Sequence, residues 1–315
     1  MAKLRKIADK DKLDKQDIGR LRGNDMTLDE MEYDAELQKT IDNTIRREFP
    51  QFYKGQIPDI LNPTDFTLLI RKDKPYILGK GCSGIIFLAQ HNESRELVVI
   101  KAYGVYKKLQ EILKECGYQQ RAQIALEKNG FTPSRLIGFL KIKEDSPLRK
   151  NYFHMLSVLS IASLVKDVPL CLPLEQATNM LEKGKIAITK NQWGDIIYLL
   201  VKAVKVMNEA GVHHADYHDG NLCITYEDGR YNLSVLDFGE SREIEPSFDH
   251  IDMHASMDLV MRITKLLHMK QTNKFAMKMD VIDDFDFPAL LRELKAVIQE
   301  DLRRAKTIGC RMKLF

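Results

Sequence analysis

The chain has 315 residues, of which 44% are hydrophobic and 30% are charged, a balance typical of a globular protein with a substantial core. Its formal net charge of +3 is too small to predict general attraction to nucleic acid or to membrane surfaces. Five widely spaced cysteines without a C-x-x-C pair argue against a zinc ribbon and a disulfide framework, and no apolar run is long enough for a membrane span.

Residues 1–62 are expected to form a charged helical extension. The first twenty residues contain no apolar stretch of the signal-peptide kind, so we expect a cytoplasmic location. The stretch "MTLDEMEYDAELQKTIDNTIRREF" predicts a helix with Thr27 as its N-cap and acidic residues in its first turn. The simplest interpretation is a solvated surface helix without activity. The cluster "IPDILNPTD" then indicates a boundary.

Residues 63–157 are expected to form a small sheet with one helix. The stretches "FTLLIRKDKPYILGKGCSGIIFLAQ" and "ELVVIKAYGV" are rich in β-branched and aromatic residues, which is typical of strands joined by tight turns. The stretch "KKLQEILKECGYQQRAQIALEKNG" has helical spacing and ends at Gly130. Strand character returns in "SRLIGFLKIKE" and "NYFHMLSVLS".

Residues 158–315 are expected to be mainly helical. The stretch "QWGDIIYLLVKAVKVMNEAG" is apolar on one face, with Asn191 as a possible N-cap and Gly211 at its end. Two short strands, "LCITYED" and "YNLSVLD", are joined by the hairpin signal "EDGR". The C-terminal "FPALLRELKAVIQEDLRRAKTIGCRMKLF" predicts an amphipathic helix packed on this region, with membrane or nucleic-acid docking by its basic end as the alternative.

The glycine cluster "LGKGCSGII" matches G-x-G-x-x-G at Gly79, Gly81 and Gly84, with Ile86 at the β-branched position that follows. Glycines are needed where backbone N–H groups approach phosphate oxygens without obstruction by side chains. Dinucleotide-binding folds share the spacing, but there a helix follows the motif, whereas strand residues follow it here. A plain glycine-rich hairpin is the competing interpretation.

Lys101 lies in the β-branched run "VVIKAY", where a strand could present its ammonium group to nucleotide phosphates. A lysine of this kind could equally be a solubilising charge on an edge strand. The helix that follows offers Glu111 and Glu115 as partners for the ammonium group. We favour Glu115, which leaves a fuller turn of helix before it, although Glu111 remains open.

The stretch "HHADYHDGN" places His214, Asp216 and Asn221 in the pattern H-x-D-x-x-x-x-N, and "LDFG" follows with Asp237, Phe238 and Gly239. The glycine motif, the strand with Lys101 and these two patterns thus stand in the order and the structural contexts of a protein kinase. The chain from about residue 65 to residue 265 therefore resembles the eukaryotic-like protein kinase superfamily. The resemblance implies an α+β fold of two lobes, a small β-rich N-lobe with one helix and a mainly helical C-lobe with a truncated activation segment.

The resemblance also implies the roles of individual residues. The loop Gly79, Lys80, Gly81, Cys82, Ser83 and Gly84 would cover the phosphates of ATP, Ile86 would line the adenine site, and Lys101, held by Glu115, would pair with the phosphates. Asp216 would accept the proton of the acceptor hydroxyl, and His214 would support the loop. Asn221 and Asp237 would hold Mg²⁺, which prefers oxygen ligands.

Departures from the family pattern narrow the function. Ala215 replaces the arginine that usually receives an activation-loop phosphate, so activation of that type is not expected. No A-P-E follows Gly239, which implies a reduced platform for peptide substrates. Asp258 is our first choice for bracing the catalytic loop from a following helix, with Asp252 as its rival.

Protein serine/threonine kinase is the leading interpretation, with a protein substrate. The alternatives are an atypical small-molecule kinase and a pseudokinase or nucleotide-binding scaffold. The compact form also resembles bacterial effector or viral kinases, in which case the location would be the cytoplasm of a host cell. An iron oxygenase using His214, Asp216 and His250 or His254 would leave the glycine loop and Lys101 unexplained. A metal-hydrolase pair of His218 and Asp219 meets the same objection, and His213 and His218 read as ordinary loop residues.

Overall fold

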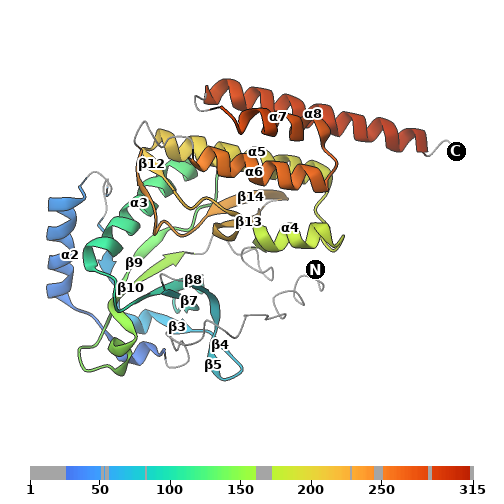
Figure 1. Ribbon diagram of the computed structural model, residues 1–315. Coiled ribbons are helices and arrows are strands. Elements are labelled where there is room, and N and C mark those ends of the chain that lie inside the picture. Colours follow the sequence, from blue (N-terminus) through green and yellow to red (C-terminus); the bar gives the residue numbers. More distant parts are fainter. Residues whose placement is uncertain are drawn as a thin grey trace. The chain divides into compact units, whose positions relative to one another are not determined.

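The computed structural model is an α+β structure that divides into two compact units (Figure 1). It describes residues 26–50, 53, 57–81, 84–160, 172–227, 229–244, 251–282 and 286–312. Unit 1 comprises Met1–Gln123 and Ser134–Leu170, and unit 2 comprises Ile124–Pro133 and Cys171–Phe315. The division differs from the expected boundaries after residues 62 and 157, because the segment before residue 63 belongs to the same unit as the sheet.

Unit 1 is built on an eight-stranded sheet whose central path runs β1-β9-β10-β8-β7-β3, with β2 added at β9 and β6 added at β7. All its pairs are antiparallel except β2 with β9. The strands are β1 (Met31–Glu32), β2 (Asp59–Ile60), β3 (Phe66–Leu68), β6 (Ile77–Gly81), β7 (Gly84–His91), β8 (Leu97–Gly104), β9 (Leu136–Ile142) and β10 (Tyr152–Ser160). A separate ribbon pairs β4 (Ile70–Arg71) with β5 (Lys74–Pro75).

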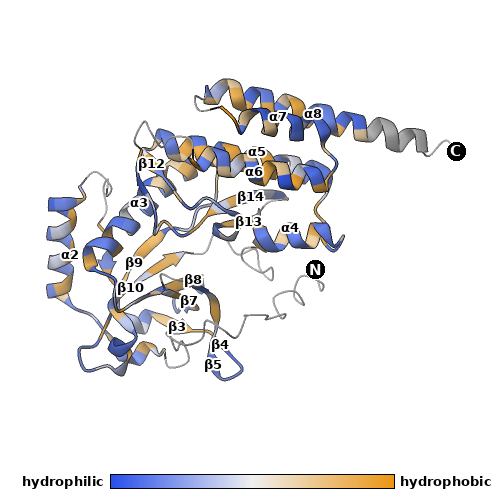
Figure 2. Cartoon of the chain, in the orientation of Figure 1, coloured by the Kyte–Doolittle hydropathy of each residue, from blue (hydrophilic) through white to orange (hydrophobic). Residues whose placement is uncertain are grey.

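The core of unit 1 is apolar and fully buried, and it includes Ile85, Phe87, Ile100, Leu140 and Leu156. Figure 2 shows β9 and β10 as mainly hydrophobic, whereas helix α2 (Ala35–Glu48) is mainly hydrophilic. Burial of large aliphatic and aromatic side chains on this scale is the principal force that stabilises such a sheet. Helix α3 (Leu109–Lys128) follows β8 and ends before Gly130, whose φ of +83° fits the C-terminal cap predicted there.

The N-terminal helix begins later than the sequence predicted. Thr27 caps only a short 3₁₀ turn, η2 (Leu28–Glu30), and Met31 and Glu32 then form β1 against Ile142 and Lys141 of β9. Helix α2 begins after Asp34, whose carboxylate accepts hydrogen bonds from the backbone N–H groups of Glu36 and Leu37. The prediction of a continuous helix from Thr27 was wrong, because pairing with a distant strand outweighs the local capping signal.

Unit 2 is mainly helical. Helices α5 and α6 pack on each other, α7 packs on α6, and α8 contacts both α5 and α7 (Figure 1). A three-stranded sheet of order β11-β13-β14 packs against α4 and α5. The helices are α4 (Leu174–Glu182), α5 (Lys190–Glu209), α6 (Ile251–Leu266), α7 (Lys270–Met279) and α8 (Phe287–Met312). The strands are β11 (Leu172–Pro173), β12 (Val212–His213), β13 (Leu222–Glu227), β14 (Arg230–Val235) and β15 (Arg242–Glu243).

The start of α5 corrects the predicted cap. Thr189, not Asn191, is the N-cap, because Thr189 and Gln192 exchange backbone and side-chain hydrogen bonds in a capping box. The predicted end is confirmed at Gly211, whose φ is +72°. The hairpin predicted at "EDGR" is confirmed by the register of β13 with β14.

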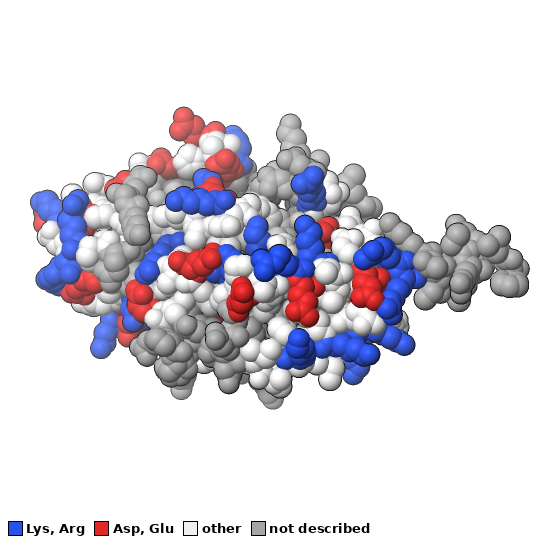
Figure 3. Space-filling view, turned by 90° about the horizontal axis from the view of Figure 1, so that it is seen from above, with Lys and Arg blue, Asp and Glu red and all other residues white. Residues whose placement is uncertain are grey.

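The surface and the cysteines add three observations. On the face seen in Figure 3, Lys and Arg side chains are interspersed with Asp and Glu side chains. Among the residues that the structure describes, no helix combines the length and hydrophobicity that crossing a bilayer requires. Cys223 is disulfide-bonded, although the spacing of the cysteines argued against a disulfide framework, whereas Cys116 is a free and buried thiol.

Candidate functional site

The glycine motif lies at the tip of the β6–β7 hairpin of unit 1. Gly81 of β6 stands opposite Gly84 of β7, and Cys82 and Ser83, which the sequence assigned to the phosphate-covering loop, lie outside the described residues. Lys80 stands opposite Ile85 in the same hairpin. The two strands predicted on either side of the glycine motif are therefore paired, and the turn between them lies outside the described residues.

Gly79 and Gly84 differ in what a side chain at each position would contact. At Gly84 a Cβ would lie 2.1 Å from the backbone oxygen of Ala102, so close packing on β8 requires a glycine there. At Gly79 a Cβ would meet no atom of the described chain within 4 Å, and its φ is not positive. Neither packing against the described residues nor backbone conformation requires a glycine at position 79.

Strand register brings Gly79, Ile86 and Lys101 side by side across three strands. Gly79 of β6 stands opposite Ile86 of β7, which in turn stands opposite Lys101 of β8. Side chains of directly opposed residues lie on the same face of a sheet. Ile86 and Lys101 therefore share a face beside the glycine hairpin, as the resemblance implied.

Lys101 forms a buried ion pair with Glu115. The Lys101 Nζ lies 2.5 Å from the Glu115 Oε1, and the two side chains are only 7% and 4% exposed. Glu111, the other candidate, accepts a hydrogen bond from the backbone N–H of Lys108 at the start of α3. The structure thus pairs Lys101 with Glu115. Removing one partner of a buried ion pair costs about 3–5 kcal/mol, because the other charge is left without compensation.

In unit 2, His214 ties two backbone segments together. Its Nε2 lies 2.9 Å from the carbonyl oxygen of Leu236, and its Nδ1 accepts a hydrogen bond from the backbone N–H of Asp216. Since the carbonyl oxygen of Leu236 can only accept a hydrogen bond, the proton is on the Nε2 of His214, and the ring is neutral. Burial is the main cause that lowers the pKa of His214. The predicted supporting role fits this geometry.

Asp216 and Asn221 lie in direct contact. The Asn221 Nδ2 donates to the Asp216 Oδ2 at 2.8 Å and to the Asp216 backbone oxygen at 3.0 Å. The Asp216 side chain is 45% exposed, so its carboxylate is accessible to a substrate. Because the amide nitrogen of Asn221 is used inside the loop, its Oδ1 is the atom that could bind a metal.

Asp237 follows β14 in a left-handed backbone conformation, with φ of +57°. The preceding residue, Leu236, donates its backbone N–H to the oxygen of Asn221 at 2.9 Å, which joins the segment of Asp237 to the loop of Asn221. The ring of Phe238 contacts the ring of His214 edge-on at 4.9 Å. Strained residues of this kind cluster at functional sites and persist where the surroundings hold them.

Asp237 and Asn221 are the residues predicted from the sequence as oxygen ligands of Mg²⁺. Among the described residues, no group of three His, Cys, Asp or Glu side chains could hold a metal ion. Mg²⁺ is usually held by one or two protein oxygens together with phosphates and waters. Asp237 and the Oδ1 of Asn221 would supply two such oxygens, and their binding of Mg²⁺ stays a prediction.

Asp252, in α6, holds the backbone of this loop by hydrogen bonds. Its Oδ2 accepts from the backbone N–H of His214 at 2.6 Å and its Oδ1 from that of Ala215 at 3.0 Å. Ala215 has a φ of +64°, so these bonds hold a strained residue. Asp258, the first choice from sequence, is exposed; that prediction was wrong because α6 begins at Ile251 and not at Asp258.

A partly buried contact also joins the loop to the chain after Gly239. Arg242 pairs with His213 between β15 and β12, and the Arg242 Nε donates to the His213 Nδ1 at 3.1 Å. The His213 Nε2 lies 3.6 Å from the Asp252 Oδ1. Burial, followed by the charge of Arg242, lowers the pKa of His213 to about 4. Sequence reasoning missed this role, since Arg242 carries no motif signal.

The alternative metal sites receive no support from the geometry. Both nitrogens of His214 interact with backbone groups, so His214 cannot serve as an iron ligand without breaking those bonds. His254 lies 3.4 Å from Asp280, and His250 lies outside the described residues. The His218 Nδ1 accepts from the backbone N–H of Gly220, and Asp219 pairs with Arg262 of α6. His214, His218, His254 and Asp219 therefore have structural partners.

No protein-family model matches the chain, and no curated protein is found to match it.

Proposed function

We propose that the chain is an ATP- and Mg²⁺-dependent phosphotransferase with a kinase-like bilobal fold, which moves the γ-phosphate of ATP to a hydroxyl group. The observation that carries the proposal is the arrangement of the loop in unit 2. There Asn221 holds Asp216, His214 bonds to Leu236, and Asp252 fixes the strained residue between them. The buried pair of Lys101 and Glu115 in unit 1 supplies independent support.

Phosphoryl transfer depends on positioning and charge neutralisation more than on covalent chemistry. The Asp216 carboxylate, accessible and oriented by Asn221, would accept the proton of the acceptor hydroxyl. Asp237 and the Oδ1 of Asn221 would hold Mg²⁺, which neutralises phosphate charge when bound. Lys101, fixed by Glu115, would pair with phosphate oxygens, and the hairpin from Gly79 to Gly84 would cover them.

We propose a serine or threonine side chain of a protein as the acceptor. A small-molecule hydroxyl is the second candidate, and one observation favours it. Only residues 240–250 separate Gly239 from the start of α6, which leaves little chain for a peptide-binding platform. A nucleotide-binding scaffold without transfer is the third candidate, although no residue assigned to catalysis is replaced.

The test is transfer of labelled phosphate from ATP by the purified chain with Mg²⁺, offered protein and metabolite acceptors in parallel. Asp216→Asn keeps an oxygen that can accept from Asn221 but removes the base, and we expect transfer to fall about 10²–10⁴-fold. Lys101→Met should abolish transfer by removing the phosphate partner. The matched controls are Asp258→Asn and Lys128→Met, which alter exposed side chains. Undiminished transfer in both site variants would contradict the assignment, and nucleotide binding without transfer would favour the scaffold.

A further inference from the structure

The described residues between 26 and 61 are an integral part of unit 1. Strand β1 pairs with β9, and β2 adds to β9 as its only parallel neighbour in the described sheet. Gln38 of α2 bonds to Ile60 through its Oε1 and to Pro58 through its Nε2. The segment is therefore joined to the sheet at two strands and along the helix between them, contrary to the simplest interpretation of a solvated extension.

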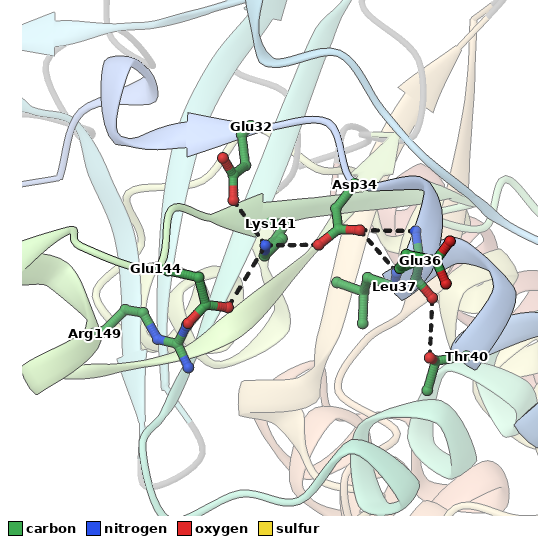
Figure 4. Close-up of polar contacts among 8 residues, drawn as sticks. All are labelled: Glu32, Asp34, Glu36, Leu37, Thr40, Lys141, Glu144 and Arg149. Atoms are coloured by element: carbon green, nitrogen blue, oxygen red, sulfur yellow. Dashed lines mark hydrogen bonds and ion pairs between the residues drawn. The ribbon is translucent and has the colours of Figure 1, made fainter.

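Lys141 of β9 is the centre of this attachment (Figure 4). Its Nζ lies 2.7 Å from the Glu32 Oε1, 2.6 Å from the Asp34 Oδ2 and 3.6 Å from the Glu144 Oε1, and its side chain is only 8% exposed. The Asp34 carboxylate has two functions, since its Oδ1 also caps α2. The Lys141 ammonium group thus fixes the start of α2 relative to β9.

Tyr53 connects the same segment to α3. Its side chain is 5% exposed, and its hydroxyl donates to the carbonyl oxygen of Leu113 at 2.5 Å. A carbonyl oxygen has two lone pairs, so Leu113 can accept this bond while it remains within the helix. The bond spans 60 residues of sequence and lies inside the unit.

Leu113 is two residues before Glu115 on α3. Burial is the main cause that raises the pKa of Tyr53, and the nearby Cys116 and Glu115 of this part of the helix raise it further. Ile112, Leu113 and Cys116 are fully buried around the contact. A shift or rotation of this turn would move the Glu115 carboxylate relative to Lys101, because a helical turn moves as one rigid piece.

We propose that Tyr53 is a positioning residue: the described residues between 26 and 61 form a brace, attached to β9 through Lys141, that holds α3 through the Tyr53–Leu113 hydrogen bond and thereby fixes Glu115 against Lys101. The catalytic part of this inference rests on the proposed phosphotransferase function. The mechanical part does not, since it concerns only contacts within unit 1. In this proposal the contacts of Tyr53 keep Glu115 in the position where it pairs with Lys101.

The test compares Tyr53→Phe, which removes only the buried hydroxyl, with Tyr33→Phe, which removes the hydroxyl of a tyrosine that is 61% exposed in the same segment. Amide hydrogen exchange of the full-length chain, measured on peptides covering α3, reports the brace without requiring activity. We expect exchange in the turn around Leu113 to become about fivefold faster in Tyr53→Phe, the loss of one hydrogen bond, and to stay unchanged in Tyr33→Phe.

A double-mutant cycle with Glu115→Gln reports whether Tyr53 acts through the ion pair. We expect Tyr53→Phe to lower phosphate transfer about fivefold in the wild-type background and about twofold or less in the Glu115→Gln background. Equal losses in both backgrounds, or unchanged transfer despite faster exchange, would overturn the positioning role. Unchanged exchange in α3 would overturn the brace. A wild-type chain that transfers no phosphate would overturn the proposed function alone, and the exchange comparison would still decide the brace.

Discussion

Asp252 and His213 should make opposite contributions to the dependence of stability on pH. Burial is the main cause that raises the pKa of Asp252 from 3.8 to about 6, and burial lowers the pKa of His213 from 6.5 to about 4. Each shift is about 2 pKa units, or about 3 kcal/mol of linkage. Both act in the same window, between about pH 4 and pH 6.5.

The signs follow from proton counting. Between about pH 4 and pH 6 the folded state keeps the Asp252 proton that the unfolded chain has lost, so stability falls as pH rises and the contribution is absent above pH 6. For His213 the unfolded chain is protonated and the folded state is neutral, so stability rises with pH and is lost as pH falls through about 4. The two effects nearly cancel in the wild-type chain.

Asp252→Asn should expose the His213 contribution. In this variant we expect the free energy of unfolding to rise by about 3 kcal/mol between pH 4 and pH 6.5 relative to the wild type, because the contribution of His213 is no longer offset by that of Asp252. Urea unfolding at four pH values measures the difference, with Asp258→Asn as the control at an exposed aspartate on the same helix. A difference between variant and wild type that does not change with pH would refute the assignment of a raised pKa to Asp252.

Two further predictions use matched positions in unit 1. Gly84→Ala should destabilise the fold, because its Cβ would collide with Ala102, whereas Gly79→Ala should leave the thermal midpoint unchanged and weaken ATP binding; equal effects on both properties would contradict the assigned roles. Cys116 should resist alkylation at pH 8 in the native chain, because burial raises the pKa of its thiol to about 12. Peptide mapping after iodoacetamide treatment measures this, and rapid native modification of Cys116 would count against it.

Local patterns predicted the elements that depend on local chemistry. The hairpin of β13 and β14, the end of α3 before Gly130 and the end of α5 at Gly211 follow from turn and cap residues that lie within a few positions of the feature they specify. The motif spacing likewise located His214, Asp216 and Asn221, which lie in one loop. These features need no knowledge of the rest of the fold.

Features that depend on distant contacts were missed or misassigned. Thr27 has a good capping sequence, yet Met31 lies in a strand because Ile142, more than a hundred residues later, is its partner. Asp252 could not be separated from Asp258 before the start of α6 was known. Tyr53 carries no local signal at all, since its role depends on the carbonyl oxygen of Leu113.

The replacement of the usual arginine by Ala215 has a structural counterpart in Arg242. Under the proposed function, an arginine beside Asp216 would serve to bind a phosphate or another anion. Here the arginine lies after Gly239 instead, and its Nε already bonds to His213, in register with β12. Ser241 adds a hydrogen bond to the backbone oxygen of His214. Residues 240–244 are therefore joined to the loop of Asp216 by contacts within the chain, and under the proposed function these contacts require no phosphorylation.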